Sequence, residues 1–336
     1  MSNLTLNPVQ AKNFIANCKK VYDKKSVIPE WENVYFQDGK MKLFYNDGFL
    51  SVDIDHNLNG GYYFEQFEKF AGTRKDDIYI SDTDIVSGKS KLNIPFVDRY
   101  DPKESEPEIF AFSCEFNSDK IKDYLGIIST DELRISMTGI YFDAKNGAIV
   151  GTDAHLLIKR DHKIEESFIM PTTACKLIAS LKNIDVMVCV SKRSVQITWM
   201  QDGLKYTFMS MAIDARYPDW LSVIPVNDIP VTFDKKEMIE AIKDVLPFTS
   251  SYTNRVEFNF EKKFVIGQDI DFSSEMKVDI SSMVGNFQNM GFNGKMMLKV
   301  LSIVFNIEMK VSTPNRAALF MENETDFVLI MPIMLS

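Results

Sequence analysis

Hydrophobic and polar positions follow the same pattern in three stretches of the chain, at a spacing far longer than that of a solenoid repeat. Each stretch is a short strand that ends in Asn or Asp: Leu4–Asn7, Cys114–Asn117 and Val231–Asp234. An Asn or Asp side chain accepts hydrogen bonds from the free N–H groups of a first helical turn, so a helix is predicted after each one. Apolar residues stand four, seven, eight and eleven positions after each cap, which is the stripe of an amphipathic helix.

A second landmark keeps nearly the same distance from the three caps. Strands that end in serine, at Ile78–Ser81, Val188–Ser191 and Met309–Ser312, place that serine 74, 74 and 78 residues after the cap. A usual domain size of roughly 100–150 residues makes two or three domains the expectation for this length. The repeat therefore predicts three tandem copies of one domain. Their predicted bounds are 1–107, 108–226 and 227–336.

The pattern also predicts the elements within each copy. Polar or proline-bearing stretches at 98–108 and 223–230 are expected to be linkers. Two helices are expected in each domain, between strands that short turns connect in sequence. Such strands form antiparallel sheets with the helices on one face, so the predicted class is α+β. The six predicted helices are Pro8–Tyr22, Tyr62–Ala71, Ser118–Ile128, Thr172–Asn183, Lys235–Leu246 and Asn293–Phe305.

Composition narrows the setting of the protein. The N-terminus is polar, and the longest apolar run, Phe327–Leu335, is much shorter than the roughly 20 residues that span a bilayer. The four cysteines show no CxxC pairing, and we expect reduced, buried thiols in the cytoplasm. We therefore expect no membrane association.

Charge is distributed unevenly. The chain carries a net charge of −9, yet the six predicted helices together carry +6 and the remainder −15. Such segregation suits a positive surface made of helices and a negative surface made of sheet edges and loops. The alternative is that these lysines occupy the solvated faces of ordinary amphipathic helices.

Three motifs resemble a known family. They are Arg134–Asp143 (RISMTGIYFD) followed by Gly151–Leu157 (GTDAHLL), then Ile213–Pro225 (IDARYPDWLSVIP), and finally Val328–Leu335 (VLIMPIML). In this order they resemble the bacterial DNA polymerase III β subunit, the β sliding clamp. The resemblance is strong in the predicted second domain and at the C-terminus, and weaker but colinear in the first domain.

The resemblance implies a head-to-tail homodimer of three-domain subunits that closes into a ring, with helices around a central hole and sheets outside. Duplex DNA passes through the hole without sequence preference, and the ring tethers a replicative polymerase. No catalytic residue, metal or cofactor is implied. The residues implied to face DNA are Lys12, Lys19, Lys20, Lys176, Lys182, Lys295 and Lys299, with Lys24, Lys25 and Arg134 near the rim.

Polymerases and clamp loaders of the family dock a short peptide in a groove between the second and third domains. The matching positions here are Met137, Thr152, Ala154, His155, Leu156, Leu157, Pro218, Ser222, Val223, Asn293, Met296, Ala318, Phe320, Leu329, Met331, Pro332, Ile333 and Met334. Leu157, Val223, Phe320 and Leu329 could equally be core residues of strands. The positions implied for the dimer interface are Leu92, Ile94, Val245 and Phe248.

The chain departs from the family pattern at three groove positions. Leu156 and Met334 stand where the family has arginine, and Ser222 stands where it often has arginine. The groove is therefore expected to be more apolar and less cationic than usual. A docking peptide of different sequence would suit such a groove, as in a phage, plasmid or other divergent replicon.

Two other functions stay open. Asp153 with His155, and Asp161 with His162, could be ligands of a metal-dependent hydrolase, although no further ligands follow at a recognisable spacing. The chain also has no P-loop, no dinucleotide-binding glycine motif and no nucleophile elbow. A monomeric scaffold that binds peptides without encircling DNA is the other alternative.

Overall fold

The computed structural model describes residues 4–22, 26, 28–46, 48–102, 112–226, 228–269 and 271–335. The chain forms two compact units. Unit 1 comprises Met1–Lys122 and Met170–Asp214, and unit 2 comprises Asp123–Ile169 and Ala215–Ser336. The strand pairs described in both units are antiparallel and helices pack beside the sheets, so the predicted α+β class is confirmed.

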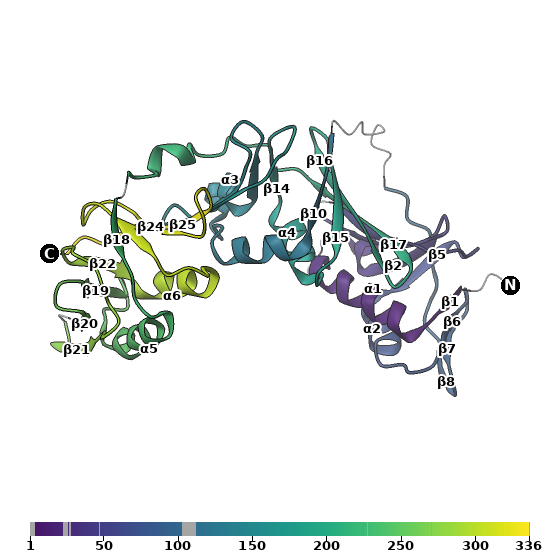
Figure 1. Ribbon diagram of the computed structural model, residues 1–336. Coiled ribbons are helices and arrows are strands. Elements are labelled where there is room, and N and C mark those ends of the chain that lie inside the picture. Colours follow the sequence, from purple (N-terminus) through teal and green to yellow (C-terminus); the bar gives the residue numbers. More distant parts are fainter. Residues whose placement is uncertain are drawn as a thin grey trace. The chain divides into compact units, whose positions relative to one another are not determined.

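Unit 1 contains a four-stranded and a nine-stranded sheet (Figure 1). The smaller has the order β1 (Leu4–Leu6), β6 (Ile78–Ile80), β7 (Ile85–Ser87) and β8 (Ser90–Leu92). The larger has the order β10 (Phe112–Asn117), β15 (Asp185–Val190), β16 (Ser194–Gln201), β17 (Leu204–Met211), β4 (Gly48–Asp53), β3 (Lys40–Tyr45), β2 (Asn33–Gln37), β5 (Gly60–Tyr63) and β9 (Val97–Asp98). Its helices are α1 (Pro8–Val21), α2 (Phe64–Ala71) and α4 (Thr172–Ser180), with the 3₁₀ helix η1 (Pro29–Glu32). Helix α1 packs against α2 and α4, and all three contact strands of the large sheet.

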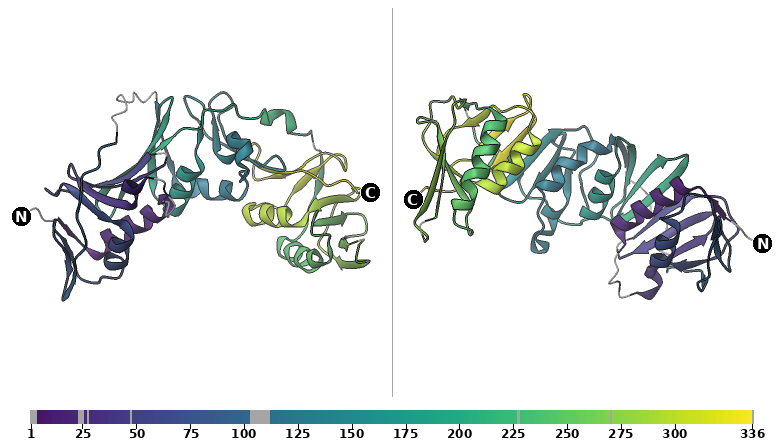
Figure 2. Two further views of the ribbon diagram at one scale, coloured as in Figure 1. Left: turned by 180° about the vertical axis from the view of Figure 1, so that it is seen from behind. Right: turned by 90° about the horizontal axis from the view of Figure 1, so that it is seen from below.

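Unit 2 is built from an eight-stranded and a four-stranded sheet. The larger has the order β14 (Phe168–Met170), β11 (Ile140–Asp143), β12 (Ala148–Thr152), β13 (Leu156–Asp161), β25 (Phe327–Ile330), β24 (Ala318–Met321), β23 (Met309–Val311) and β18 (Ile229–Val231). The smaller has the order β21 (Ser274–Asp279), β20 (Phe264–Asp269), β19 (Arg255–Asn259) and β22 (Met290–Asn293). Helices α5 (Lys235–Val245) and α6 (Gly294–Ile303) lie side by side (Figure 2). The short helices are α3 (Ile135–Thr138), η3 (Glu132–Arg134), η4 (Trp220–Val223) and η5 (Leu246–Phe248).

Five of the six predicted helices are present as α-helices, and two of their caps have the predicted chemistry. The Asn7 side chain accepts hydrogen bonds from the N–H groups of Val9 and Gln10 at 3.0 and 2.9 Å, and the Gln10 side chain accepts one from the Asn7 N–H. The Asp234 side chain caps α5 by accepting a bond from the Glu237 N–H at 2.8 Å. These caps satisfy N–H groups that have no partner within the helix.

The predicted α-helix at Ser118–Ile128 is wrong. This segment is the 3₁₀ helix η2 (Ser118–Gly126). The Asn117 side chain accepts a hydrogen bond from the Asp119 N–H at 3.1 Å, two residues on, and so closes a tight local turn. The apolar stripe correctly indicates which face of the helix packs against the protein. It does not fix the helix type, because a stripe with a period near 3.6 does not exclude a 3₁₀ helix with a period of 3.

The two units cut through the predicted second domain. Strands β15, β16 and β17 continue into β4 through the pair Tyr206–Val52, whereas β13 continues into β25 through the pair Leu157–Leu329. The division into three domains therefore stays a prediction. The linker predicted at 223–230 is wrong at its end, because Pro230 lies in β18, an edge strand where proline removes no hydrogen bond. Most of the other predicted linker, 103–108, lies outside the described residues.

The described cysteines form no disulfide: Cys18 and Cys175 are buried, and Cys114 and Cys189 are half-buried. Burial raises the pKa of the Cys18 thiol, which therefore stays protonated at neutral pH. Among the described residues, no helix is both long and apolar enough to cross a membrane.

An ion-pair network fixes β13 in unit 2. The Arg160 guanidinium donates to both carboxylate oxygens of Glu322 at 2.8 and 2.9 Å, and to Asp123 at 2.7 Å. Neighbouring Lys159 on the same strand is bound by Asp161 and by the Thr325 carbonyl. Bidentate pairs of this kind hold planar groups in one geometry. The network thus joins β13 to η2 and to the turn between β24 and β25.

Candidate partner-binding groove and nucleic-acid interface

Unit 2 contains a cavity of about 160 Å³ where β12 ends, β13 begins, η4 passes and β25 ends. Ten of the eighteen residues predicted for the peptide groove line it. These ten are Met137, Thr152, Ala154, His155, Leu156, Leu157, Pro218, Val223, Leu329 and Met331. Segments far apart in sequence therefore meet at one site, as the prediction requires.

The cavity has an apolar floor and a partly exposed rim. Leu156, Leu157 and Leu329 are buried, and Leu157 stands opposite Leu329 across the β13–β25 ladder. Val223 and Met331 are 48% and 36% exposed and form part of the rim. Leu157 and Leu329 are thus core strand residues and lining residues at once, so these two alternatives do not exclude each other. An apolar cavity with few polar groups suits aliphatic or aromatic anchors of a ligand.

A tight turn positions His155 at the mouth of the cavity. The Asp153 carboxylate accepts hydrogen bonds from the N–H groups of His155 and Leu156 at 2.8 and 2.6 Å. Ala154 has a φ of +77°, a left-handed conformation that costs energy for any residue with a Cβ. The Thr152 hydroxyl donates to the Leu156 carbonyl at 2.6 Å and closes the turn. Asp153 therefore has a structural role as the acceptor of this turn.

Sequence reasoning missed two lining residues, Asp219 and Trp220. The Trp220 indole N–H donates to the buried Asp143 carboxylate at 2.8 Å, which fixes the ring in the wall. Beside it, the Tyr217 ring stacks on Tyr141 with centroids 4.5 Å apart, and burial raises the pKa of Tyr217. Both missed residues lie within the Ile213–Pro225 motif. The acidic and aromatic pair directly after Pro218 is the feature of the sequence that could have indicated them.

The C-terminal segment after β25 forms the last wall. The Met331 N–H donates to the His155 carbonyl at 2.8 Å, and the Ile333 N–H donates to the Gly291 carbonyl at 2.7 Å. A Cβ at Gly291 would lie 2.6 Å from the Ile333 carbonyl oxygen, so glycine is required for this approach. Pro332 and Ile333 are half-buried and Met334 is 67% exposed, and none of these three residues lines the cavity itself.

Several residues predicted for the groove lie elsewhere. Ala318 and Phe320 are fully buried, and the Phe320 ring packs 6.4 Å from the Phe233 ring in the core. Asn293 caps α6 by accepting a bond from the Met296 N–H at 3.1 Å, so both residues belong to a helix start. The exposed Ser222 hydroxyl donates to the Asp219 carbonyl at 2.7 Å, within η4. For Phe320, the prediction of a groove residue is wrong because β24 is buried on both faces.

Leu156 stands where the resemblance implies an arginine, and its surroundings would not suit an arginine side chain. Leu156 is fully buried, paired with Ile330 on β25. An arginine introduced there would place its charge against an apolar floor, where an unpaired charge is costly. Met334, by contrast, is exposed enough to accept an arginine freely. Among the described lining residues, Asp219 and His155 are the polar groups that can carry charge.

The lysines predicted to contact DNA lie on exposed helix faces of both units. Lys12 and Lys20 on α1, Lys176 on α4 and Lys295 and Lys299 on α6 are exposed. Further members of the predicted set are Lys182 and Arg134, which are exposed, with Arg134 3.6 Å from the Asp131 carboxylate. Lys19 is also exposed but pairs with Glu68 on α2 at 2.7 Å. Lys24 and Lys25 lie outside the described residues.

Helix α5 adds two cations that sequence reasoning missed. Lys236 and Lys243 are exposed and line a shallow depression along this helix. The net charge of the helix did not indicate them, because the negative charges of Glu237, Glu240 and Asp244 cancel the positive charges of its lysines. Local position, rather than net helix charge, therefore decides which cations are available.

Each unit contains a four-stranded sheet with an outer strand that pairs on one side only with the described strands. Strand β8 is an edge of the four-stranded sheet in unit 1, and Leu92 at its end is half-buried, as is Ile94 beyond it. Strand β21 is an edge of the four-stranded sheet in unit 2. Phe248 is 39% exposed, but the prediction that Val245 is an interface residue is wrong, because Val245, the last residue of α5, is fully buried.

A large apolar side chain at the second edge was missed. Phe272 is 82% exposed and lies just before β21. Exposed apolar residues beside a free strand edge are typical of interaction sites. Its signal in the sequence was weak, because Phe272 stands in a polar turn.

Comparisons with known proteins show which proteins the chain resembles. No family model matches the chain. It is 22% identical to the beta sliding clamp of Chlamydia trachomatis, over 67% of this chain and 58% of the relative, so it spans little more than half of that protein. It is 23% identical to the beta sliding clamp of Rickettsia bellii, over 97% of both chains.

Solved structures extend the comparison over the full length. The sliding clamp (DNA polymerase III subunit beta) of Bartonella birtlesii, in a crystal structure with griselimycin bound, superposes with a TM-score of 0.85, 19% identity and complete coverage of both chains. The DNA polymerase III beta subunit of Thermotoga maritima gives 0.81, 18% identity and complete coverage. The chain has the fold of the β sliding clamps.

The match to the clamp structure covers the sheets of both units. It includes the edge strands β8 and β21 and the segment that follows β25. In sequence the chain is distant from the bacterial clamps that it matches, at 22–23% identity. Among the described residues, no group of three or more His, Cys, Asp or Glu side chains is placed to hold a metal ion.

Proposed function

We propose that the protein is a DNA sliding clamp, a homodimeric ring that encircles duplex DNA and tethers a replicative polymerase in the cytoplasm. The single observation that carries the proposal is the full-length match to clamp structures, with complete coverage of both chains. Curated relatives with the same name support it. Three copies of one domain, at 1–107, 108–226 and 227–336, would give each dimer six domains around the hole.

The charges suit a sliding contact. Lysines on helices attract phosphates without reading bases, so the contact is independent of sequence and is screened by salt. The net charge of −9 disfavours DNA on the outer surface of the ring. A closed ring then keeps the protein on DNA even though each contact is weak, and the tether requires no reaction, metal or cofactor.

The groove of unit 2 is proposed to hold a short peptide of the polymerase or the clamp loader. Its apolar floor of Leu156, Leu157 and Leu329 would take the peptide's aliphatic or aromatic anchors. A monomeric scaffold of the clamp fold would use the same groove, but it would leave both sheet edges unpaired.

The mass in solution separates these two functions. We expect light scattering at micromolar concentration to give twice the 38.5 kDa of the chain. A mass of one chain over the same concentration range would favour the scaffold. A nuclease assay with and without Mg²⁺ tests the hydrolase alternative on the same sample, and we expect no cleavage.

The contact of the helices with DNA gives a quantitative prediction. Reversing Lys295 and Lys299 to glutamate removes two exposed cations from one face of α6. The proposed dimer carries each reversal twice, and we expect the slope of log affinity against log salt concentration to fall by roughly 1 for each phosphate contact that the ring loses. The measurement is retention on nicked circular DNA over a range of salt concentrations.

The matched control is a variant in which two lysines of loops, and not of helices, are replaced by glutamate. Lys145 and Lys163 are exposed and lie outside the helices. We expect Lys145→Glu with Lys163→Glu to leave the salt slope within experimental error. Equal loss of retention in both variants would mean that net charge alone, and not the helix face, governs binding.

A further inference from the structure

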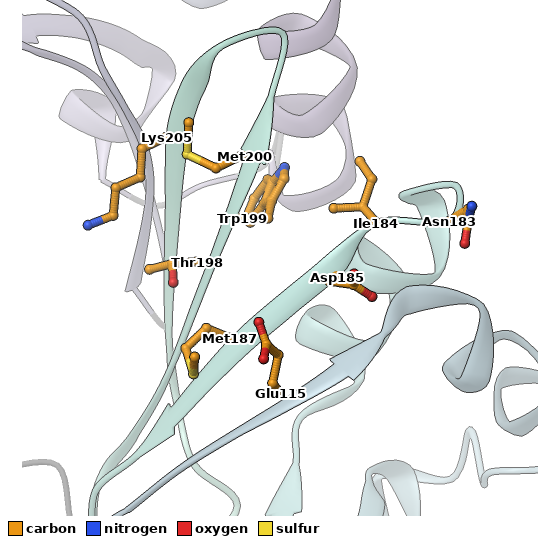
Figure 3. Close-up of a pocket in the computed structure, with 9 residues that line it drawn as sticks. All are labelled: Glu115, Asn183, Ile184, Asp185, Met187, Thr198, Trp199, Met200 and Lys205. Carbon is orange, nitrogen blue, oxygen red and sulfur yellow. The ribbon is translucent and has the colours of Figure 1, made fainter.

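A second cavity lies in unit 1, and it shares no lining residue with the groove of unit 2. It has a volume of about 520 Å³ and opens where strands β15 and β16 diverge (Figure 3). The residues that line it are Glu115, Asn183, Ile184, Asp185, Met187, Thr198, Trp199, Met200 and Lys205. Every one of them belongs to unit 1, on β10, β15, β16 or β17 or directly before β15.

The cavity lies where the ladder between β15 and β16 ends before either strand does. Strands β15 and β16 pair from Val190–Val195 to Met187–Thr198, and no further pair is formed. In an antiparallel ladder, alternate residues direct both the N–H and the C=O to the same neighbouring strand. The Ser118 N–H donates to the Ile184 carbonyl, on the β10 side, so Asp185 directs its backbone groups toward β16.

The same alternation applies to β16. Gln201 pairs with Leu204 at the two-residue turn into β17, so Met200 directs its N–H and C=O toward β15. Asp185 and Met200 would thus form the next hydrogen-bonded pair, but the strands have separated at that point. In the described residues, these backbone groups have no partner in a strand ladder. Unpaired strand groups at an open edge are a template for an added strand.

The side chains around this opening give it a negative charge, which favours a cationic ligand. Glu115 and Asp185 are exposed carboxylates of neighbouring strands, on the same face as Met187. The carboxylate of Asp185 accepts a hydrogen bond from the Asn117 amide at 3.0 Å, which fixes its position. Met200 is 59% exposed, and the buried Trp199 lies at the floor, stacked on Tyr206. The one cation in the lining, Lys205, projects away from the carboxylates (Figure 3).

We propose that this opening, the β15–β16 slot, binds an extended peptide that carries cationic side chains at alternate positions. The peptide backbone pairs with the free groups of Asp185 and Met200. Its outward cationic side chains face Glu115 and Asp185, and its inward apolar side chains face Trp199 and Ile184. The slot is separate from the groove of unit 2, so the inference does not depend on the proposed sliding clamp function.

Fluorescence anisotropy with a labelled octapeptide of alternating valine and lysine tests the slot, with a valine–glutamate octapeptide as the charge control. Proline at position 200 removes the N–H that faces the slot, while the groups that pair β16 with β17 at Trp199 and Gln201 remain. We expect Met200→Pro to weaken binding of the lysine peptide about fivefold, since one hydrogen bond is lost. Met200→Ala keeps the donor and serves as the matched control, with binding expected to stay closer to wild type.

A second pair of variants tests the charges without altering the backbone. We expect Glu115→Gln with Asp185→Asn to weaken binding about fivefold, because two charge contacts are lost. Asp77→Asn with Asp82→Asn changes the net charge equally at exposed positions of unit 1 outside the slot, and we expect unchanged affinity.

Methyl NMR of labelled methionines locates the bound peptide. We expect the signals of Met187 and Met200 to shift and that of Met137, in the groove of unit 2, to stay fixed. Shifts at Met137 alone would overturn the proposal. It would also be overturned by absence of saturable binding, by equal affinity for both octapeptides, or by equal losses in the slot variants and their controls.

Discussion

The variant Val223→Asp is expected to lose at least tenfold in affinity for the partner polymerase and most of the stimulation of that polymerase. Val223 is 48% exposed at the rim of the apolar groove. A carboxylate there would have to lose its hydration whenever an apolar anchor entered, and burying an unpaired charge is costly. Because the wild-type side chain is half in solvent, folding is not expected to suffer.

The chain offers a close control three residues away. Val226 is 85% exposed and does not line the groove. We expect Val226→Asp to bind and stimulate like the wild type in the same titration. Deleting Met331–Ser336 removes the wall that the Met331–His155 hydrogen bond holds in place, and it should reproduce the Val223→Asp defect with the dimer intact. Normal stimulation by the deletion variant would rule out the groove as the docking site.

The second large effect concerns the subunit edge. Leu92→Asp with Ile94→Asp places two charges on the free edge at β8, and we expect soluble monomers in place of dimers. An edge contact between subunits needs a small apolar centre among paired backbone groups, and carboxylates prevent both packing and close approach. Light scattering measures the mass directly, and the monomer is expected to keep its affinity for groove peptides because the groove lies in the other unit.

Asn93 supplies the control for this edge. It is exposed between the two apolar positions, and Asn93→Asp adds charge without removing an apolar contact. We expect this variant to remain a dimer. In unit 2, Phe248→Asp or Phe272→Asp should also weaken the dimer, whereas substitution of the buried Val245 would mainly reduce stability. Dimers that persist in all the edge variants would exclude a contact through β8 and β21.

Helix caps and periodic apolar positions in the sequence predicted most of the helices. The caps at Asn7 and Asp234 and the stripes behind them predicted α1 and α5 within one residue, because both features act within a single turn. The type of the helix after Asn117 was wrong, since a local turn at Asp119 decided it. The pairing of β17 with β4 was not predictable, because register between distant strands leaves no periodic trace.

The sequence predicted many of the residues that line the groove, but it did not predict how deeply each of them is buried. The resemblance located ten lining residues, yet it did not separate Val223 at the rim from Phe320 in the core. Strands buried on both faces use the same apolar residues as a binding surface, so sequence alone gives no basis for a choice. The same limit applies to Val245, whose apolar position on α5 fits a core and an interface equally well.

Topological retention on DNA tests the central claim most directly. The protein, in excess, is incubated with nicked circular duplex, separated by gel filtration and then treated with a restriction enzyme that cuts the circle once. We predict that the protein travels with the circle, resists dilution and leaves the DNA once the circle is cut. Protein that stays bound to the linear product, or that is never retained by the circle, would contradict a ring that encircles DNA.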